Sequence, residues 1–339
     1  MNKISRRATL KIITLISSVT ASMLVTLPSY AQDTQINVGA LRFTSHAASF
    51  VAFERGYFKE QGLDVKLRFF QAAQPLAVAV ASKDIDYAVT AISGGLISLA
   101  QKGATKVIGG ALIEEPGIDG QKIVVSDKAF KSGITTPAQL NSRSYAVTQS
   151  GSSFHYMGAK IADKEGIKLS FKPLQKVGAI IGAMKSGQVD AWSIVPHIAK
   201  PLDNAGAVHI IGNVADYIPN YQVTVVFTSA DNAANKRDTS QAFLRAFSKG
   251  AADFNAALVD KTAGDKAAED MVKLIHKYVY TDRPYEKAAP SIRNGAMRIS
   301  PDAALNMDSV QDQLNWFKSE KLIKDSITVD TLVDTSYSK

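Results

Sequence analysis

The most constraining feature of this chain is an internal repeat. Displaced by 104 positions, residues 44–93 fall without a gap on residues 148–197. The match keeps the glycine that ends a helix, the apolar alternation of the next strand and the aspartate before a third strand in register. Two unrelated βαβ units can also share this pattern of glycine, apolar alternation and aspartate by chance. As a duplication, it predicts two similar α/β lobes that face each other across a cleft, which is a favoured ligand site. The identical pairs are Thr44/Thr148, Ser49/Ser153, Phe50/Phe154, Gly62/Gly166, Gln71/Gln175, Ala79/Ala183, Ser82/Ser186 and Asp86/Asp190.

Residues 1–31 predict a cleaved secretory signal peptide. Basic residues without any acid precede an apolar run at 12–27, and Ser29 and Ala31 stand where a signal peptidase cleaves. The run 5–11 also resembles a twin-arginine export signal, although Thr9 replaces the bulky residue usual there. Export by the Sec route stays open. Both routes predict a mature protein in the periplasm.

The composition excludes several classes of protein. The chain has no cysteine, which excludes disulfides, thiolate metal sites and a cysteine nucleophile. Its formal net charge is +8, but the basic residues are dispersed, so we expect no nucleic-acid partner. A mature chain of roughly 300 residues can bury the cores of two lobes without disulfides or structural metals. We expect a monomer.

Strand and helix patterns alternate along the chain, which predicts an α/β fold with a parallel sheet in each lobe. Beyond residue 227 the pattern is helical, and it includes a helix capped by Ser300 that runs to Phe317. Apolar strands at 107–113 and 223–227 are the expected crossings between the lobes and form the expected hinge. The predicted first lobe is residues 32–113 plus 224–339, and the predicted second lobe is residues 114–223. The expected strands are 36–41, 65–69 and 86–92, the expected helices are 50–58 and 75–82, and the same succession returns at 145–194.

Three phrases of the sequence resemble the periplasmic binding proteins of the nitrate, sulfonate and taurine group of ABC importers. They are GYFKEQGLDV at 56–65, ASKDIDYA at 81–88 and SGQVDA at 186–191, and residues 329–337 are similar to the usual end of these proteins. The resemblance implies a two-lobed type II binding-protein fold, with mostly parallel sheets flanked by helices and joined by two hinge strands. It also implies a small-molecule ligand, an ABC permease as membrane partner and an ATPase met only indirectly.

The resemblance leaves the ligand open. It favours a sulfonate, a taurine-like compound or another organic acid, with a thiamine-pyrimidine precursor as the alternative. The same fold family contains fungal proteins that make the thiamine pyrimidine and look cysteine-rich near the active site, from which this chain departs. Neither a Gly-x-Ser-x-Gly nor a His-Glu-x-x-His motif occurs. We therefore expect a binding protein and not an enzyme.

Candidate ligand residues follow from the rule that open parallel sheets bind small molecules beyond the carboxyl ends of their strands. The hydroxyl-rich turn at 148–153 suits an anion at a helix N-terminus, and it suits an ordinary N-cap equally well. Arg42 can pair with an oxyanion or lie in solvent, and Trp192 can stack on a flat ligand or pack in the core. The predicted ligand residues are Arg42, Thr44, Ser45, His46, Gln71, Ser93 and Gly94 in the first lobe, and Gln149, Ser150, Gly151, Ser152, Ser153, Phe154, Trp192 and His197 in the second.

Two further groups of polar residues lie near the predicted cleft. His46, His155 and His197 are accompanied by no carboxylate at metal-ligand spacing, so no metal and no other cofactor is expected. Glu114 and Glu115 stand at the first crossing, where one of them could meet an amine on the ligand, although we expect exposed hinge acids.

Overall fold

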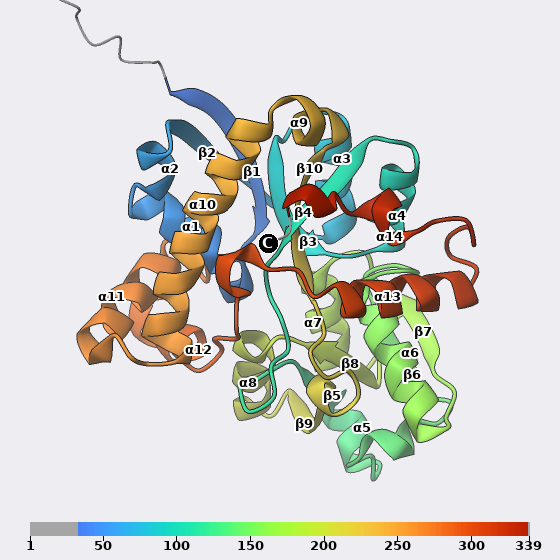
Figure 1. The fold of residues 1–339 in the computed structure, drawn as a ribbon. Coiled ribbons are helices and arrows are strands. Elements are labelled where there is room, and N and C mark those ends of the chain that lie inside the picture. Colours follow the sequence, from blue (N-terminus) through green and yellow to red (C-terminus); the bar gives the residue numbers. More distant parts are fainter. Residues whose placement is uncertain (1–32, 338–339) are drawn as a thin grey trace, which may run out of the picture. The chain divides into compact units, whose positions relative to one another are not determined.

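The computed structural model describes residues 33–337, and Figure 1 shows two lobes, each built on one five-stranded sheet. The predicted signal peptide lies outside the described residues. The sheet of the first lobe has the order β2-β1-β3-β10-β4 and that of the second lobe the order β7-β6-β8-β5-β9. The strands are β1 Thr34–Leu41, β2 Leu63–Phe70, β3 Tyr87–Ala91, β4 Thr105–Gly110, β10 Thr224–Ser229, and β5 Lys122–Ser126, β6 Ser144–Val147, β7 Ser170–Pro173, β8 Ala191–Ile194, β9 Val208–Asn213.

Helices flank both sheets (Figure 1). The helices that precede the second crossing are α1 Ala47–Glu54, α2 Tyr57–Glu60, α3 Ala73–Ala81 and α4 Gly94–Gln101 in the first lobe, and α5 Asp127–Lys131, α6 Ser153–Glu165, α7 Val177–Lys185 and α8 Pro196–Asn204 in the second. The remaining helices are α9 Ala230–Asn235, α10 Arg237–Phe254, α11 Gly264–His276, α12 Tyr285–Arg293, α13 Met307–Ser319 and α14 Val329–Leu332.

The repeat in the sequence is a repeat of structure. Helix α7 begins and ends 104 residues after α3, and β8 begins 104 residues after β3. Gly62 and Gly166 both adopt left-handed backbone, with φ of 70° and 65°, which glycine adopts without strain. Asp86 accepts a hydrogen bond from a backbone N–H of β1 (2.8 Å), and Asp190 accepts one from a backbone N–H of β6 (2.9 Å). Each aspartate therefore ties its third strand to its first.

The sheets are mostly parallel, as expected, and each contains one antiparallel strand that the alternation of strands and helices did not indicate. Strand β10 is antiparallel to β3 and β4, and β5 is antiparallel to β8 and β9. Both β10 and β5 follow a crossing from the other lobe, so each reaches its sheet without the crossover helix that makes neighbouring strands parallel. The other strands of each sheet are parallel to one another, as the βα alternation predicts.

Two predicted helices are interrupted. Gly56, with φ of 76°, separates α1 from α2, so the apolar spacing at 50–58 does not form one helix. The helix expected from Ser300 begins only at Met307, where the Asn306 side chain accepts a hydrogen bond from the backbone N–H of Ser309 (3.1 Å). Asp302 and Ala303 have φ of 52° and 53°, and such backbone cannot continue an α-helix.

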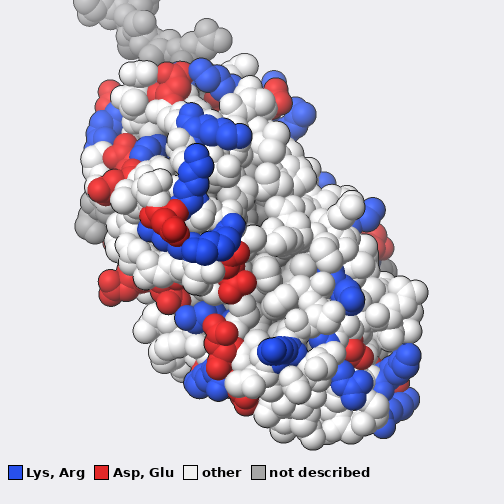
Figure 2. Space-filling view, turned by 90° about the vertical axis from the view of Figure 1, so that its right-hand side faces the viewer, with Lys and Arg blue, Asp and Glu red and all other residues white. Residues whose placement is uncertain are grey.

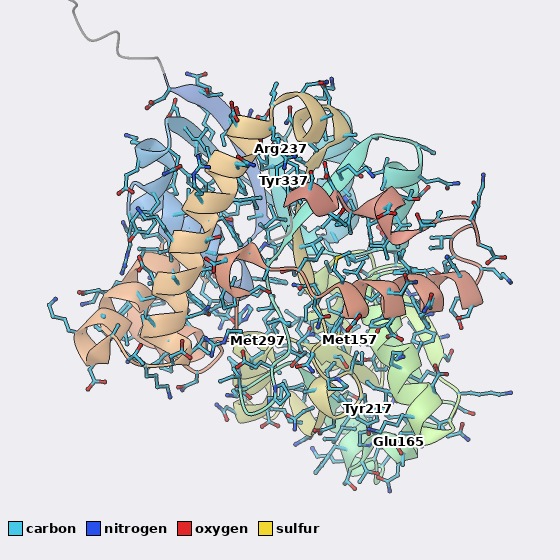
Figure 3. The ribbon with its side chains drawn as sticks, viewed as in Figure 1. Met157, Glu165, Tyr217, Arg237, Met297 and Tyr337 are labelled. Carbon is cyan, nitrogen blue, oxygen red and sulfur yellow. The ribbon has the colours of Figure 1, made fainter. Side chains whose placement is uncertain are left out.

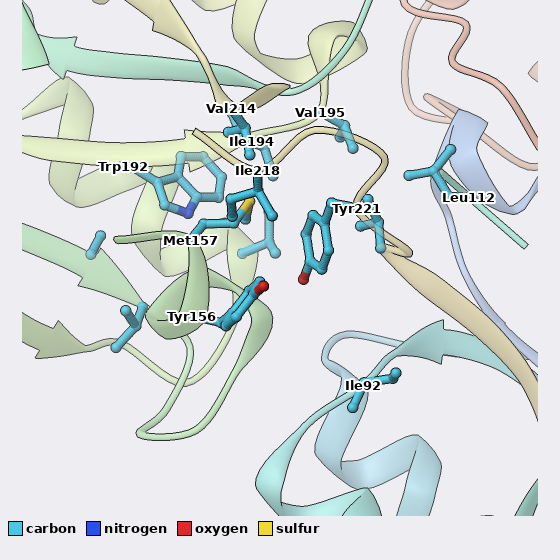
Figure 4. Close-up of a cluster of buried hydrophobic side chains, with 14 of the residues drawn as sticks. Ile92, Leu112, Tyr156, Met157, Trp192, Ile194, Val195, Val214, Ile218 and Tyr221 are labelled. Carbon is cyan, nitrogen blue, oxygen red and sulfur yellow. The ribbon is translucent and has the colours of Figure 1, made fainter. Parts of the chain in front are cut away.

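The two crossings run side by side between the lobes. The backbone N–H of Val223 donates to the carbonyl of Leu112 (2.9 Å), and the N–H of Glu114 donates to that of Tyr221 (2.9 Å). Buried residues from both lobes and from the crossings form one hydrophobic cluster, part of which Figure 4 shows around Trp192, Met157 and Tyr221. Packing of apolar side chains is therefore continuous through the connection.

The C-terminal segment contacts both lobes. Trp316 of α13 packs edge-on against His155 and Tyr156 of α6, with ring centroids 5.1 Å and 5.3 Å apart. Further along, the Arg237 guanidinium at the start of α10 lies over the Tyr337 ring at 4.4 Å, and Figure 3 labels both residues. The sequence analysis assigned α13 to the first lobe, but α13 contacts the second lobe through Trp316. The boundaries of the two lobes therefore stay a prediction.

The charged side chains on the surface are dispersed, as the sequence predicts. On the face drawn in Figure 2, basic side chains are interspersed with acidic ones. Among the helices of residues 33–337, none combines the length and the apolar character needed to cross a membrane.

Candidate functional site

A small cavity lies between the lobes at the carboxyl ends of the strands. Leu41, Ala91, Thr148 and Ile194, at or next to the ends of β1, β3, β6 and β8, all contribute to its wall. Its volume is about 60 Å³, which is room for a few water molecules or for a small part of a solute. Because both lobes form the wall, separating the lobes would open the cavity.

Five helix N-termini meet at this cavity. Its wall includes His46 before α1, Ala73 at the start of α3, Ser153 at the start of α6, Val177 at the start of α7 and Val195 before α8. The free N–H groups and the helix dipole give each N-terminus a partial positive charge. The arrangement therefore favours an anionic or neutral group over a cation.

No Lys, Arg, Asp or Glu stands among the described residues that line the cavity. Burial lowers the pKa of His46 to about 3, so this imidazole is neutral. The backbone N–H of Leu41 donates to His46 Nδ1 (3.3 Å), which places the ring hydrogen on Nε2. Polar contacts to a ligand would come from neutral groups, namely Ser45, His46, Thr90, Gln121, Thr148, Ser152, Ser153 and Thr224, and the rest of the wall is apolar.

Gln121 is a cavity residue that the sequence analysis missed. Its side chain is 2% exposed, and its Nε2 has no hydrogen-bond partner among the described residues. A buried amide without a partner is costly, and a ligand acceptor would remove that cost. Gln121 precedes β5 at the end of the first crossing, outside the repeated segments, so the strand-end rule did not point to it.

The predicted ligand residues fall into three places. Ser45, His46, Ser152, Ser153 and Phe154 line the cavity. Arg42 and His197 line a separate pocket nearer the surface. The others line neither, and their role at the ligand remains a prediction: Thr44, Gln71, Ser93, Gly94, Gln149, Ser150, Gly151 and Trp192.

Three of these other residues connect the lobes directly. The backbone N–H of Gly94, at the start of α4, donates to the carbonyl of Gly151, in the turn before α6 (2.9 Å). Beside it, the Gln149 amide donates to Oε1 of Gln74 (3.3 Å). These hydrogen bonds exist only while the lobes are together, so they stabilise the closed arrangement.

Two others belong to the packing of their own lobe. Ser93 caps α4, where its Oγ accepts from the backbone N–H of Leu96 (3.2 Å). Trp192 is fully buried and packs edge-on against Phe154 with ring centroids 5.5 Å apart. Trp192 does not line the cavity but packs on Phe154, which does.

Glu114 is buried, contrary to the expectation of an exposed hinge acid. It is 1% exposed; its Oε1 accepts from the backbone N–H of Gln121 (3.0 Å), and its Oε2 has no partner among the described residues. Burial raises the pKa of Glu114 to about 7, opposed by the hydrogen bond from Gln121 and by the charge of Lys122. The Glu114 carboxyl, which lies at the crossing between the lobes, thus fixes the backbone of the cavity residue Gln121.

We expect Glu114→Gln to change how stability depends on pH. A carboxyl with a folded-state pKa near 7 and an ordinary unfolded value binds more protons when folded, so wild-type stability falls as pH rises from about 4.5 to 7 and stays lowered above. The variant lacks this loss. Its free energy of unfolding relative to wild type should rise by about 1–3 kcal/mol between pH 5 and pH 8, measured by urea denaturation. Glu286→Gln, at an exposed position, is the control. Parallel pH profiles for Glu114→Gln and wild type would contradict the assignment.

The fold, with two α/β lobes around a cavity, is that of the two-lobed periplasmic binding proteins. The sequence model of the NMT1/THI5-like family matches residues 43–257, which is more than half of the chain. The chain belongs to this family. No protein of curated function matches the sequence.

Several solved structures share the fold. The ligand-binding component of an ABC-type import system from Staphylococcus aureus, with zinc bound, is 15% identical over 90% of this chain and 97% of its own, with a TM-score of 0.71. The nitrate-binding protein NrtA from Synechocystis is 13% identical over 90% and 87%, with a TM-score of 0.70. The alkanesulfonate-binding protein SsuA from Xanthomonas axonopodis pv. citri, bound to MOPS, is 16% identical over 90% and 99%, with a TM-score of 0.69.

Proposed function

We propose that this protein is the periplasmic solute-binding component of an ABC importer. It captures a small organic anion between its lobes by hinge closure and delivers it to the membrane permease. The observation that carries this proposal is the cavity walled by both lobes, into which the buried Gln121 amide brings a free donor. A ligand that touches both lobes binds the closed form better than the open one and so shifts the population toward it. The import and binding roles named for the similar structures support the same reading.

The chemistry of the cavity supports an organic anion of small size. Five helix N-termini favour negative charge, and the hydroxyls and the amide supply hydrogen bonds to oxygen. The largely apolar wall suits a hydrocarbon portion. A sulfonate, a taurine-like compound or another small organic acid combines these features, and we place this class first.

A neutral flat compound such as a thiamine-pyrimidine precursor is the second candidate. It is favoured by one observation, the lack of any charged side chain on the cavity wall. A pyrimidine would meet neutral donors and acceptors and lose no charge hydration on binding. In neither case does the cavity offer a catalytic constellation, and incubation should return the solute unaltered.

Solute binding is tested first with the wild-type protein. Mass spectrometry of the protein purified under native conditions identifies a retained compound, and a thermal-shift panel compares alkanesulfonates, small carboxylates, nitrate and an aminopyrimidine. A ligand present at 100 times its dissociation constant stabilises by about 2.7 kcal/mol. Stabilisation by an organic anion, with a change in the scattering curve on binding, is the expected result. Stabilisation by the aminopyrimidine alone would select the second candidate, and no response from any compound would contradict both.

We expect Gln121→Leu to weaken binding of the solute identified in this way. The substitution removes the buried donor while keeping the side chain about as large. A hydrogen bond to a charged group contributes about 1.5–3 kcal/mol, so the dissociation constant measured by calorimetry should rise by about tenfold to a hundredfold. Gln188→Leu, on an exposed turn of the same lobe, should leave it unchanged. An unaltered dissociation constant in Gln121→Leu would mean that the amide does not face the solute.

A further inference from the structure

A second, larger pocket lies between the lobes outside the cavity. Its volume is about 340 Å³, and the first lobe contributes Arg42, Phe43 and Arg283 to it. From the second lobe, α7 contributes its last residue, Lys185, and α8 contributes His197. We call it the outer pocket. Three of the residues that line it are cationic and none is acidic.

The three cations are not neutralised by the protein. Within residues 33–337, none of Arg42, Lys185 and Arg283 forms an ion pair with a carboxylate. The Arg42 guanidinium is held in place: it lies 3.9 Å from the centre of the Phe69 ring, and its Nη1 donates to the carbonyl of Tyr278 (3.0 Å). Its remaining N–H groups are still available, because a guanidinium carries five. Positive charge is thus gathered at the mouth of the cleft without a partner.

His197 adds a buried polar group that lacks a partner. Its side chain is 1% exposed, and neither ring nitrogen has a hydrogen-bond partner among the described residues. Burial and the nearby His46 lower the pKa of His197 to about 3, so the ring is neutral and offers one N–H donor. Buried donors normally find acceptors, and the pocket that this ring lines is where an acceptor could bind.

Phe43 separates the outer pocket from the cavity. It lines both, and its ring lies edge-on to His46 on the cavity side (6.0 Å between centroids) and to His197 (5.5 Å). Val177 also lines both spaces. A solute could therefore extend from the outer pocket into the cavity if the Phe43 ring is displaced.

We propose that the outer pocket is an oxyanion-binding subsite, where Arg42, Lys185, Arg283 and the ring N–H of His197 hold the sulfonate or carboxylate group of the solute at the cleft mouth. Once the Phe43 ring is displaced, the solute moves from this first contact into the cavity, where the helix N-termini and the Gln121 amide receive its charged group. This assignment rests on the proposed function only for the identity of the anion. Guanidinium groups match the paired oxygens of such an anion, and unpaired positive charge at a cleft also speeds its capture.

Selenate is the probe for the subsite, because it is a tetrahedral oxyanion that anomalous scattering locates directly. In crystals of the mature wild-type protein we expect a selenate peak in the outer pocket, within hydrogen-bond distance of His197 and a guanidinium. In solution, calorimetry should show selenate binding that weakens at least tenfold in Arg42→Gln/Arg283→Gln. Lys102→Gln/Lys168→Gln, which removes two exposed lysines that line neither the cavity nor the outer pocket, is the charge-matched control and should bind selenate as wild type does.

The outcomes separate the two proposals. No peak in the outer pocket, or a peak and affinity that survive the double variant, would overturn the subsite and leave the proposed function untouched. A selenate site in a protein that binds no organic anion would uphold anion binding and contradict the proposed function. With 1-butanesulfonate as solute, the association rate of the double variant should fall and lose most of its dependence on salt. An unchanged rate would contradict the role of the pocket in capture.

Discussion

Gly295→Ala should weaken solute binding by about 5- to 150-fold without unfolding the protein. Gly295 follows α12 in the first lobe and lies directly against the start of α8 in the second: a Cβ there would lie 2.3 Å from His197 Cβ and 2.4 Å from His197 Cα. These atoms cannot rotate away, so the lobes must move apart. Overpacking of this kind costs about 1–3 kcal/mol. Because only the closed form is destabilised by this amount, the dissociation constant rises by about 5- to 150-fold.

The measurement pairs affinity with shape. Calorimetry gives the dissociation constant, and small-angle scattering should show a variant that stays expanded at solute concentrations that compact the wild type. Gly178→Ala is the matched control, because Gly178 lies in α7 and a Cβ there meets nothing within 4 Å. Wild-type affinity and compaction in Gly295→Ala would show that the contact between Gly295 and α8 is not part of the binding-competent state.

Gly250→Ala should strongly destabilise the folded protein. Gly250 lies in α10 where that helix crosses α1, and a Cβ there would lie 2.3 Å from the carbonyl oxygen of Ala48 and 2.9 Å from the backbone nitrogen of Ala52. Backbone atoms can give way only if the helices separate. Such a shift costs about 3 kcal/mol or somewhat more, against the gain of about 1 kcal/mol that alanine normally brings inside a helix.

The free energy of unfolding from urea denaturation tests this prediction, with the thermal midpoint expected to fall on the order of 5–10 °C. Gly182→Ala in α7 is the control, since a Cβ there meets nothing within 4 Å, and it should stabilise slightly. Affinity for the solute should be preserved in the folded fraction of Gly250→Ala, because Gly250 lines neither the cavity nor the outer pocket. Equal stability of Gly250→Ala and wild type would contradict the close approach of α10 and α1.

Much of the fold could be predicted from the sequence because the signals are local. The left-handed glycines Gly62 and Gly166 and the aspartates Asp86 and Asp190 keep the same structural role in both lobes, as the repeat indicated. Glycine backbone freedom and strand alternation depend on a few neighbouring residues. The strand-end rule also selected Ser45, His46 and Ser152, which line the cavity.

Local signals misled where a single residue changes the backbone or where chain direction matters. Gly56 interrupts the first helix although the apolar spacing continues through it, and Asp302 and Ala303 end the turn after Ser300. The antiparallel strands β5 and β10 arise from the crossings, which a pattern of alternating strands and helices does not reveal.

The remaining features of the site depend on how the lobes meet. From residue types and spacing we could infer a repeat, a cleft and the strand ends that border it, because those follow from hydrogen bonding and apolar period within short segments. The buried Gln121 amide, the buried Glu114 carboxyl, the bond from Gly94 to Gly151 and the approach of Lys185 and Arg283 to Arg42 became visible only in the folded chain. Each joins segments far apart in sequence, and their proximity results from the packing of one lobe on the other.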